Sequence, residues 1–266
     1  MNKIERFHAL HAGGCFVIPN PWDLGSARLL EQLGFKAVAT TSSGLAWSNG
    51  KQDNHLSVDV VLAHCRAVAA AIEIPVNADF ENGFADEPEA VAANVARAVE
   101  TGIAGLSIED STGNSEQPLY DFEFALERVK AARRAIDESC TRVVFTARSE
   151  GMLFEGSKLS DTIERLVAYA DAGADCLFAP GLRKIEDMRA VVNAVEPKPV
   201  NVLVAGPYAN LRELEDIGVR RISTGGALAR AAWRGFIDAA QEIAEHGTFE
   251  KLGAAIPGRE FDARFA

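Results

Sequence analysis

The sequence predicts a (β/α)₈ TIM barrel, an α/β fold in which eight strands alternate with eight helices. Short apolar or β-branched runs alternate with longer stretches of helical spacing along the chain. Eight such units in 266 residues match the usual size of this barrel, whereas a doubly wound sheet has about five or six strands. No linker rich in Pro, Ser or charge interrupts the pattern, so we expect one domain spanning residues 1–266.

Eight segments have the composition of buried strands. Each is short, rich in Val, Ile, Ala or Phe, and bounded by Gly, Pro or polar residues. The predicted strands are 15–20, 36–42, 75–80, 105–110, 142–150, 175–180, 200–205 and 220–226.

The stretches between the strands carry signals for helix ends. Asp86 with Glu89, and Asp161 with Glu164, have the spacing of a capping box at a helix start. Three glycines follow helical runs a few residues before the next strand and predict left-handed helix ends: Gly102, Gly173 and Gly218.

The segment after the eighth strand, ALARAAWRGFIDAAQEIAEHG, is long and helical. A tail of about residues 247–266 follows it. We expect this tail to lie at an interface between subunits of a homodimer or homotetramer.

The composition bounds the functions open to the protein. A formal net charge of −11 repels phosphate backbones and anionic lipids, so we expect neither a nucleic-acid nor a membrane partner. The four cysteines have no metal-site spacing, and the N-terminus lacks the pattern of a secretory signal. These features favour a cytoplasmic protein with reduced, packed thiols.

Charged side chains recur near the C-terminal ends of three successive predicted strands. Side chains along a strand alternate between its two faces, and the apolar face of each strand packs on the outer helices. The polar face then points into the barrel near its C-terminal rim, where barrel enzymes keep their active sites. The residues on that face are Asp79, Glu81, Glu109, Arg148 and Glu150. We expect these five side chains to converge on one small volume.

Several carboxylates in one confined site need a counter-charge. Oxygen ligands without Cys or His favour Mg²⁺, or Mn²⁺, over zinc. Arg148 then remains to bind a substrate carboxylate with its planar guanidinium. Any one of these residues has an alternative structural explanation, such as a helix cap or an inert ion pair, but that explanation is weaker for all five together.

Two other segments carry weaker signals. Residues 40–57 are rich in small residues and predict a surface loop, with an anion-binding nest as the alternative. Gly225 and Gly226 open the last helix, where tight packing is the first interpretation and phosphate binding the second. The order and spacing of a serine hydrolase triad do not occur.

The sequence resembles the isocitrate lyase and phosphoenolpyruvate mutase superfamily over most of its length, from IPNPWDLGSARLLEQLGFKAVATTSSGLA to RRISTGGALARAA. The most specific motifs are SGLA after the second strand, Asp-x-acid-x-Gly at the third, IED at the fourth and TARSE at the fifth. The resemblance implies a barrel that exchanges its last helix with a neighbour, and a Mg²⁺ site under a mobile loop.

The resemblance also implies roles for individual residues. Asp79 would lie nearest the metal, and Asp53, Glu81 and Glu109 would bind it mostly through water. Arg148 would hold the carboxylate of a small 2-oxo or 2-hydroxy acid. The backbone of three residues would hold the other end of the substrate or its enolate: Ser43, Gly44 and Leu45.

The sequence departs from this superfamily in three places, one of which is Glu81 instead of the Asp that is usual at the second acid position. The lyases have a Lys-Lys-Cys-Gly-His stretch where this chain reads DSTGNSEQPLYDFE, with Thr112, Asn114 and Ser115 as the polar residues of the specificity loop. The mutases have a His where this chain has Ala179-Pro180-Gly181. The usual isocitrate cleavage and the phosphonate rearrangement are therefore disfavoured.

The resemblance and its departures together predict a Mg²⁺-dependent lyase. It would cleave a C–C bond of a small 2-oxo or 2-hydroxy dicarboxylic acid through an enolpyruvate-like intermediate, with decarboxylation of an oxaloacetate-like acid as the first choice. The alternatives are a phosphonopyruvate hydrolase or mutase, a non-catalytic barrel that binds metal and oxoacid, and, more weakly, a sugar-phosphate isomerase.

Overall fold

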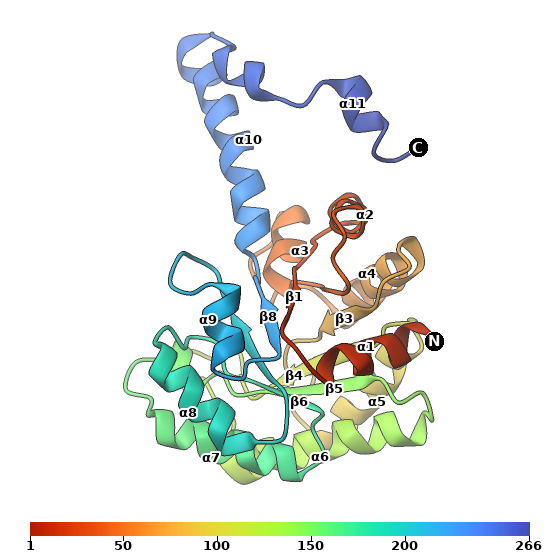
Figure 1. Cartoon of the computed structure of the whole chain (residues 1–266), viewed down its shortest axis with the longest axis vertical. Coiled ribbons are helices and arrows are strands. Elements are labelled where there is room, and N and C mark those ends of the chain that lie inside the picture. Colours follow the sequence, from red (N-terminus) through yellow and green to blue (C-terminus); the bar gives the residue numbers. More distant parts are fainter.

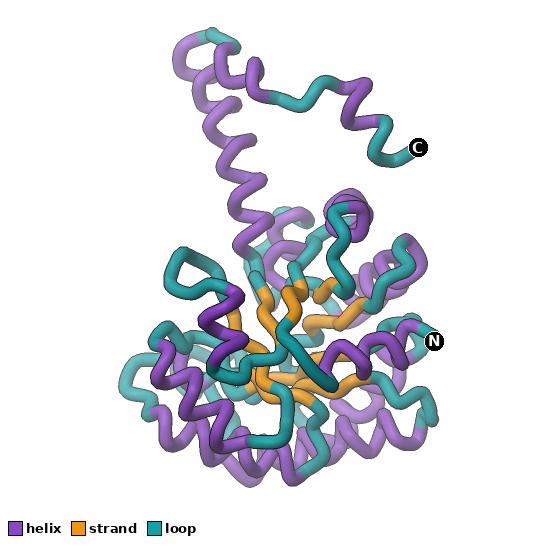
Figure 2. Tube along the Cα trace, in the orientation of Figure 1, coloured by secondary structure: helices purple, strands orange, loops and turns teal.

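Eight parallel strands form the centre of the protein in a computed structural model that describes residues 1–266 (Figures 1 and 2). Each strand lies within its predicted range and is shorter than predicted, because the predicted runs include residues of the flanking turns. The strands are β1 (Phe16–Ile18), β2 (Val38–Ala39), β3 (Val76–Asp79), β4 (Gly105–Glu109), β5 (Val144–Arg148), β6 (Cys176–Phe178), β7 (Val200–Leu203) and β8 (Arg221–Ser223).

The strands close into a barrel, as the sequence predicts. All seven strand pairings are parallel, in the order β1-β8-β7-β6-β5-β4-β3-β2. The gap between β1 and β2 is bridged by the Ala39 amide, which donates to the Pro19 carbonyl at 3.1 Å. The C-terminal ends of all eight strands therefore lie at one mouth of the barrel.

Helices surround the barrel on its outside, and α1 lies across its N-terminal end (Figure 1). The helices are α1 (Lys3–His11), α2 (Leu24–Gln32), α3 (Ser42–Ser48), α4 (Val58–Ala71), α5 (Pro88–Val99), α6 (Phe122–Glu138), α7 (Leu159–Asp171), α8 (Ile185–Val195), α9 (Leu211–Asp216), α10 (Ala227–His246) and α11 (Gly258–Asp262), with short 3₁₀ helices η1 (Gly151–Leu153) and η2 (Glu250–Ala254). None of them combines the length and apolar composition that crossing a membrane requires.

The alternation predicted along the strands is confirmed by the packing. Ala78, Phe80, Leu106 and Ile108 are fully or almost fully buried in the apolar layer between the strands and the outer helices. A second, smaller apolar cluster at the N-terminal end includes Phe7 of α1. Apolar packing therefore closes the barrel at its N-terminal end, and the mouth at the C-terminal ends of the strands stays available for an active site.

The structure confirms one set of helix signals and corrects the other. Gly102, Gly173 and Gly218 all have left-handed φ angles, of 87°, 97° and 91°. The capping boxes are wrong: the cap residues of α5 and α7 are Glu87 and Lys158, and neither side chain caps its helix.

Each correction has a local cause. Pro88 occupies the first position of α5, so the helix begins one residue later than predicted. Asp86 instead accepts a hydrogen bond from the Tyr120 hydroxyl. Asp161 lies inside the first turn of α7 and accepts from Ser160 Oγ at 2.9 Å.

The segment predicted as a loop over 40–57 contains a helix, α3. Thr41 caps it by accepting the Gly44 amide at 3.3 Å. Gly44 packs so closely that an added Cβ would lie 2.7 Å from Thr41 Cγ2 and 2.8 Å from Trp22 Cβ. Tertiary packing of this glycine therefore stabilises a helix that the small residues alone do not predict.

The C-terminal arm, residues 227–266, projects from the mouth of the barrel (Figure 1). The 20-residue helix α10 leads away from the strands, and η2 and α11 turn back toward α2. Large apolar side chains along the arm are exposed in the single chain: Phe236, Ile237, Ile243, Phe249, Leu252, Ile256 and Phe261.

Candidate active site

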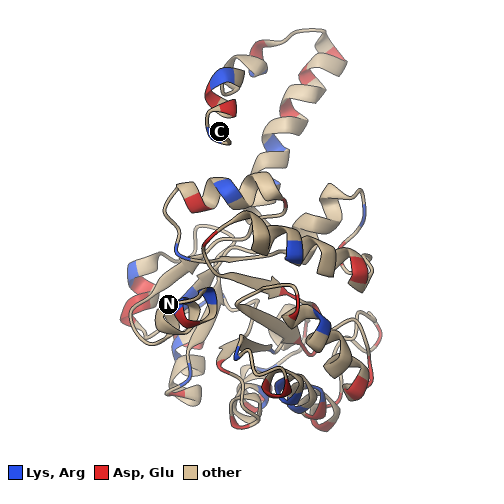
Figure 3. Cartoon of the chain, turned by 90° about the vertical axis from the view of Figure 1, so that its right-hand side faces the viewer, with Lys and Arg blue, Asp and Glu red and all other residues tan.

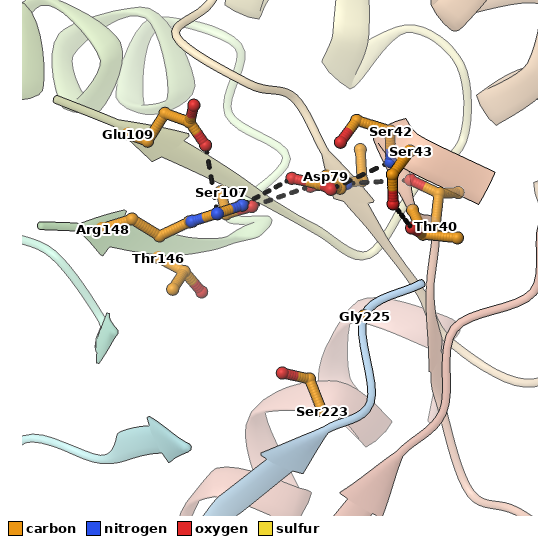
Figure 4. A network of polar contacts seen from close by, with 12 residues as sticks. Thr40, Ser42, Ser43, Asp79, Ser107, Glu109, Thr146, Arg148, Ser223 and Gly225 are labelled. Carbon is orange, nitrogen blue, oxygen red and sulfur yellow. Dashed lines mark hydrogen bonds and ion pairs between the residues drawn. The ribbon is translucent and has the colours of Figure 1, made fainter. Parts of the chain in front are cut away.

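Arg148 lies at the centre of a cluster of carboxylates at the barrel mouth (Figure 4). Its Nη1 donates to Asp79 at 2.7 Å, and its Nη2 lies 3.2 Å from Glu109. Its Nε and Nη2 both donate to one oxygen of Glu150, at 3.0 and 2.7 Å. Three strands thus bring their charged residues to one guanidinium, as the alternation predicts.

The strand register explains this convergence. Glu109 of β4 pairs directly with Arg148 of β5, so their side chains leave the same level of the barrel. Asp79, one strand further along, pairs with Ser107. Glu81 follows β3 in a left-handed conformation with φ of 47°, and its carbonyl accepts the Glu109 amide at 2.9 Å.

Asp79 also ties the barrel to α3. One of its oxygens accepts the Ser42 amide at 3.0 Å, and its own amide donates to Thr40 Oγ1 at 2.9 Å (Figure 4). The aspartate is therefore fixed from both sides, by Arg148 and by the start of α3.

Burial raises the pKa of several of these acids. Burial raises the pKa of Glu81 to about 8, and the charges of Asp79 and Asp53 add to this effect. The pKa of Asp53 is raised by burial and by the charge of Asp79. Burial also raises the pKa of Glu109, against the lowering effect of the guanidinium. The site therefore contains more negative charge than its one cation balances.

The donor set fits a hard divalent cation. Asp53, Asp79, Glu81 and Glu109 supply only carboxylate oxygens, which Mg²⁺ and Mn²⁺ prefer. No three acidic, His or Cys side chains converge on a single point as a preformed cage. These acids could therefore hold Mg²⁺ if one or two carboxylates contacted it directly and water molecules supplied its other ligands, as is common for this ion.

The substrate-binding residues predicted from the resemblance lie in two different places, at the start of α3 and on an exposed hairpin. The amides of Gly44 and Leu45 donate to Thr41 in the first turn of α3. Thr112 and Asn114 lie on an exposed hairpin, and their side chains form hydrogen bonds only within it. Neither forms a hydrogen bond to the Arg148 cluster, so their role stays a prediction.

The sequence analysis missed the residues that support Glu150. The Glu150 amide donates to Asp110 Oδ1 at 2.8 Å, and Asp110 Oδ2 accepts from Tyr169 at 2.9 Å and from Arg165 at 3.2 Å. The IED motif contains Asp110, but strand alternation places its side chain on the face opposite to that of Glu109, which faces the lumen. The helix residues have no sequence signal linking them to the rim.

A second missed residue is Arg128 of α6, which is 1% exposed. Its guanidinium donates to the carbonyls of Asn82, Ala85 and Asp86 and lies 4.0 Å from the centroid of the Tyr120 ring. Arg128 therefore holds the loop that follows Glu81.

A family model for phosphoenolpyruvate phosphomutase matches residues 7–244. The chain belongs to this family. Its members form part of the isocitrate lyase and phosphoenolpyruvate mutase superfamily of enzymes, so the resemblance seen in the sequence is confirmed. The phosphoenolpyruvate phosphomutase match spans every strand of the barrel and most of α10.

Curated relatives cover most of the chain. A Mycobacterium tuberculosis H37Rv protein without an assigned activity is 33% identical over 260 residues, 97% of this chain and 95% of its own. A probable 2-methylisocitrate lyase of Corynebacterium glutamicum is 30% identical over 84% of this chain and 75% of its own. An oxaloacetate decarboxylase of Rhodopseudomonas palustris HaA2 is 27% identical over 80% and 73%.

Solved structures share the fold. A Burkholderia cenocepacia J2315 protein, described only provisionally as a lyase or mutase, is 47% identical with a TM-score of 0.95 and covers 99% of this chain and 95% of its own. A phosphonopyruvate hydrolase that holds oxalate and Mg²⁺ is 24% identical, with a TM-score of 0.87 over 98% and 94%. The second likeness shows the fold alone.

Proposed function

We propose that this family member is a Mg²⁺-dependent lyase, with Mn²⁺ as an alternative metal, that decarboxylates an oxaloacetate-like 2-oxo acid through an enolpyruvate-like intermediate. The observation that carries the proposal is the surplus of carboxylates around Arg148. Glu81 and Glu109 have pKa values raised by burial, and the pKa of neighbouring Asp53 is raised by burial and in part by the charge of Asp79, so these acids need a second cation.

The chain's own residues supply binding and orientation in this proposal. Asp79 would contact the metal, with Asp53, Glu81 and Glu109 holding its water ligands. Bound there, the metal would supply Lewis-acid stabilisation of the enolate charge. Arg148 would bind the substrate carboxylate, held in place by the two hydrogen bonds from its guanidinium to Glu150. The start of α3 would contact the other end of the substrate.

Decarboxylation makes the fewest demands on this set of residues. CO₂ leaves without a proton donor, and the enolate carbon then takes a proton to give pyruvate. The thiol acid used by the lyases has no counterpart here, because the segment after Glu109 reads DSTGNSEQPLYDFE and contains neither Cys nor His. The oxaloacetate decarboxylase relative also favours this reaction.

The decisive assay follows pyruvate release from oxaloacetate, phosphonopyruvate or 2-methylisocitrate with Mg²⁺. The co-product identifies the reaction: CO₂, phosphate or succinate, respectively. We expect CO₂ from oxaloacetate, above the spontaneous rate measured with the Asp79→Ala variant. Phosphate from phosphonopyruvate would instead support the P–C bond alternative.

A binding assay separates a catalyst from a non-catalytic barrel. We expect oxalate with Mg²⁺ to raise the Tm of the wild type and to leave the Tm of Asp79→Ala unchanged. Asp59→Ala is a matched control, because Asp59 pairs with Arg97 on the surface. A shift without turnover of any of the three substrates would favour the non-catalytic barrel, and an equal shift in Asp79→Ala would contradict the metal assignment.

A further inference from the structure

The barrel lumen beneath the active site contains a second buried guanidinium, that of Arg221 at the start of β8. Arg221 is 3% exposed. Its Nε donates to Asn201 at 2.9 Å, its Nη2 to Thr146 at 3.0 Å, and its Nη1 lies 3.4 Å from His11 Nε2. Every one of these partners lacks a negative charge.

The His11 contact is that of a neutral ring. His11 Nδ1 lies 2.8 Å from the Phe7 carbonyl, and donating to it leaves Nε2 as an acceptor for Arg221. Burial, and then the charge of Arg221, lower the pKa of His11 to about 3. No carboxylate forms an ion pair with Arg221, in contrast to Arg148 with its three.

A small polar cavity lies between the two guanidinium groups. Its volume is about 50 Å³, and Arg221, Arg148, Asn77, Asn201 and Ser223 are among its lining residues. Ser223 and Thr146 face this part of the lumen in Figure 4. A volume of this size admits water molecules and small ions.

Asn77 supplies an independent sign that the cavity is occupied. Its side chain is 3% exposed, its Nδ2 donates to the Ala78 carbonyl at 3.1 Å, and its Oδ1 has no hydrogen-bond partner in the protein. A buried acceptor without a donor costs about 1–3 kcal/mol. A water in the cavity would satisfy it.

Water alone leaves the charge of Arg221 uncompensated. Buried charges in proteins are paired, because the desolvation penalty per ion is several kcal/mol. The nearest acid of the active site, Asp79, also lines the cavity, but its oxygens accept from Arg148 and from the Ser42 amide.

We propose that the lumen of this barrel binds one small monovalent anion of halide size against Arg221, together with one water that donates to Asn77. Three of the five N–H groups of Arg221 have protein partners, which leaves two for the anion. The cavity adjoins the active site, since Asp79 and Arg148 also line it, but binding of the anion to Arg221 does not depend on the proposed reaction. The small volume favours a halide over sulfate or phosphate.

Anion-dependent stability tests this site in solution. We expect the Tm of the wild type to be about 2–4 °C higher in sodium chloride than in sodium gluconate of equal ionic strength, at chloride a few-fold above its Kd. Arg221→Met should lose this difference. Arg220→Met is the matched control, because Arg220 is the adjacent residue and reaches outward to the Gly14 carbonyl, so it should keep the difference.

Crystals soaked in bromide provide a readout that needs no variant. We expect an anomalous peak beside the Arg221 guanidinium in the lumen. A lumen filled only with water, or equal chloride dependence in the wild type and Arg221→Met, would overturn the proposal. If Arg221→Met does not fold, the bromide map of the wild type still decides.

Discussion

The Glu81 carboxylate lies among more negative charge than one guanidinium balances. Burial raises its pKa to about 8, so in the metal-free protein Glu81 is protonated at neutral pH. The folded state then binds a proton that the unfolded state releases above about pH 4.5, and stability falls as the pH rises from there through 8. We expect the Tm of the metal-free protein to decrease over this window, and to decrease less in Glu81→Gln.

Magnesium should reverse this pH dependence. A cation favours the ionised acids, so its stabilising effect grows as the pH rises. Thermal unfolding between pH 5 and 8, with EDTA or with Mg²⁺, measures both trends. A Glu81→Gln variant with the same pH profile as the wild type would show that another group causes the fall.

Gly44 tests the predicted role of α3 in substrate binding. An added Cβ would overlap Thr41 and Trp22, so α3 must shift, and the Ser42 amide that holds Asp79 shifts with it. A displacement of about 1 Å at a site can cost about 10²-fold in rate. We expect Gly44→Ala to lower kcat/KM for oxaloacetate by about 10- to 100-fold. Gly13→Ala, which has no atom within 4 Å of the added group, should leave kcat/KM unchanged.

The residues at the rim could be predicted because two simple rules apply to them. A two-residue period assigns Asp79, Glu109 and Arg148 to the lumen, and the fold places strand ends at one mouth. The same period also assigns Arg221 to the face of Ser223, as the segment RRISTGG indicates. The partners of Asp110 could not be predicted, because they come from α7, a distant helix.

At the scale of elements, Arg128 connects α6 to the loop that follows β3. Its guanidinium is the donor for three carbonyls of residues 82–86, a loop in which Gly83 and Phe84 also have left-handed φ angles of 80° and 57°. Arg128→Met would leave these carbonyls without that donor, at about 1–3 kcal/mol for each one that stays buried.

Urea unfolding measures this contribution. We expect Arg128→Met to lower the free energy of unfolding by about 3 kcal/mol or more. Arg134→Met is the control on the same helix, since Arg134 is exposed and pairs with Glu89 on the surface, where such a pair contributes about 0–1 kcal/mol. Equal losses in the two variants would contradict a specific role for Arg128.

The order of elements was predictable, and their ends were less so. The eight strands follow from the alternation of short apolar runs with helical stretches. The start of α5 was missed because Pro88 moves it by one residue. Helix α3 was missed because Gly44 packs against Trp22 and Ala229, which are distant in the sequence. Cys140 is exposed, so the expectation that all four thiols are packed is wrong for that residue. Local pattern therefore predicts the eight strands and their order, whereas the existence of α3 depends on tertiary packing and the start of α5 on Pro88.

At the scale of the whole molecule, charge is spread over the outside and apolar surface is concentrated on the arm. Acidic and basic side chains are interspersed over the outer helices (Figure 3). The arm instead exposes Phe236 by 62%, Phe249 by 62% and Ile256 by 51%. Single exposed apolar residues are common, but a series of them along one projecting segment marks an interaction surface.

We expect this arm to pack against a second copy of the chain in a homodimer or homotetramer, with α10 exchanged between barrels. The helix leaves the barrel without a partner for its apolar side chains, and its length carries them beyond the chain's own strands (Figure 1). Phe236→Glu with Ile243→Glu would place charge on that surface and should shift the mass from light scattering toward that of one chain. Gln241→Glu adds a charge at another exposed position of α10 and should keep the oligomer. Exchange of α10 requires a second copy of the chain. A wild type that is monomeric at micromolar concentration would therefore contradict it.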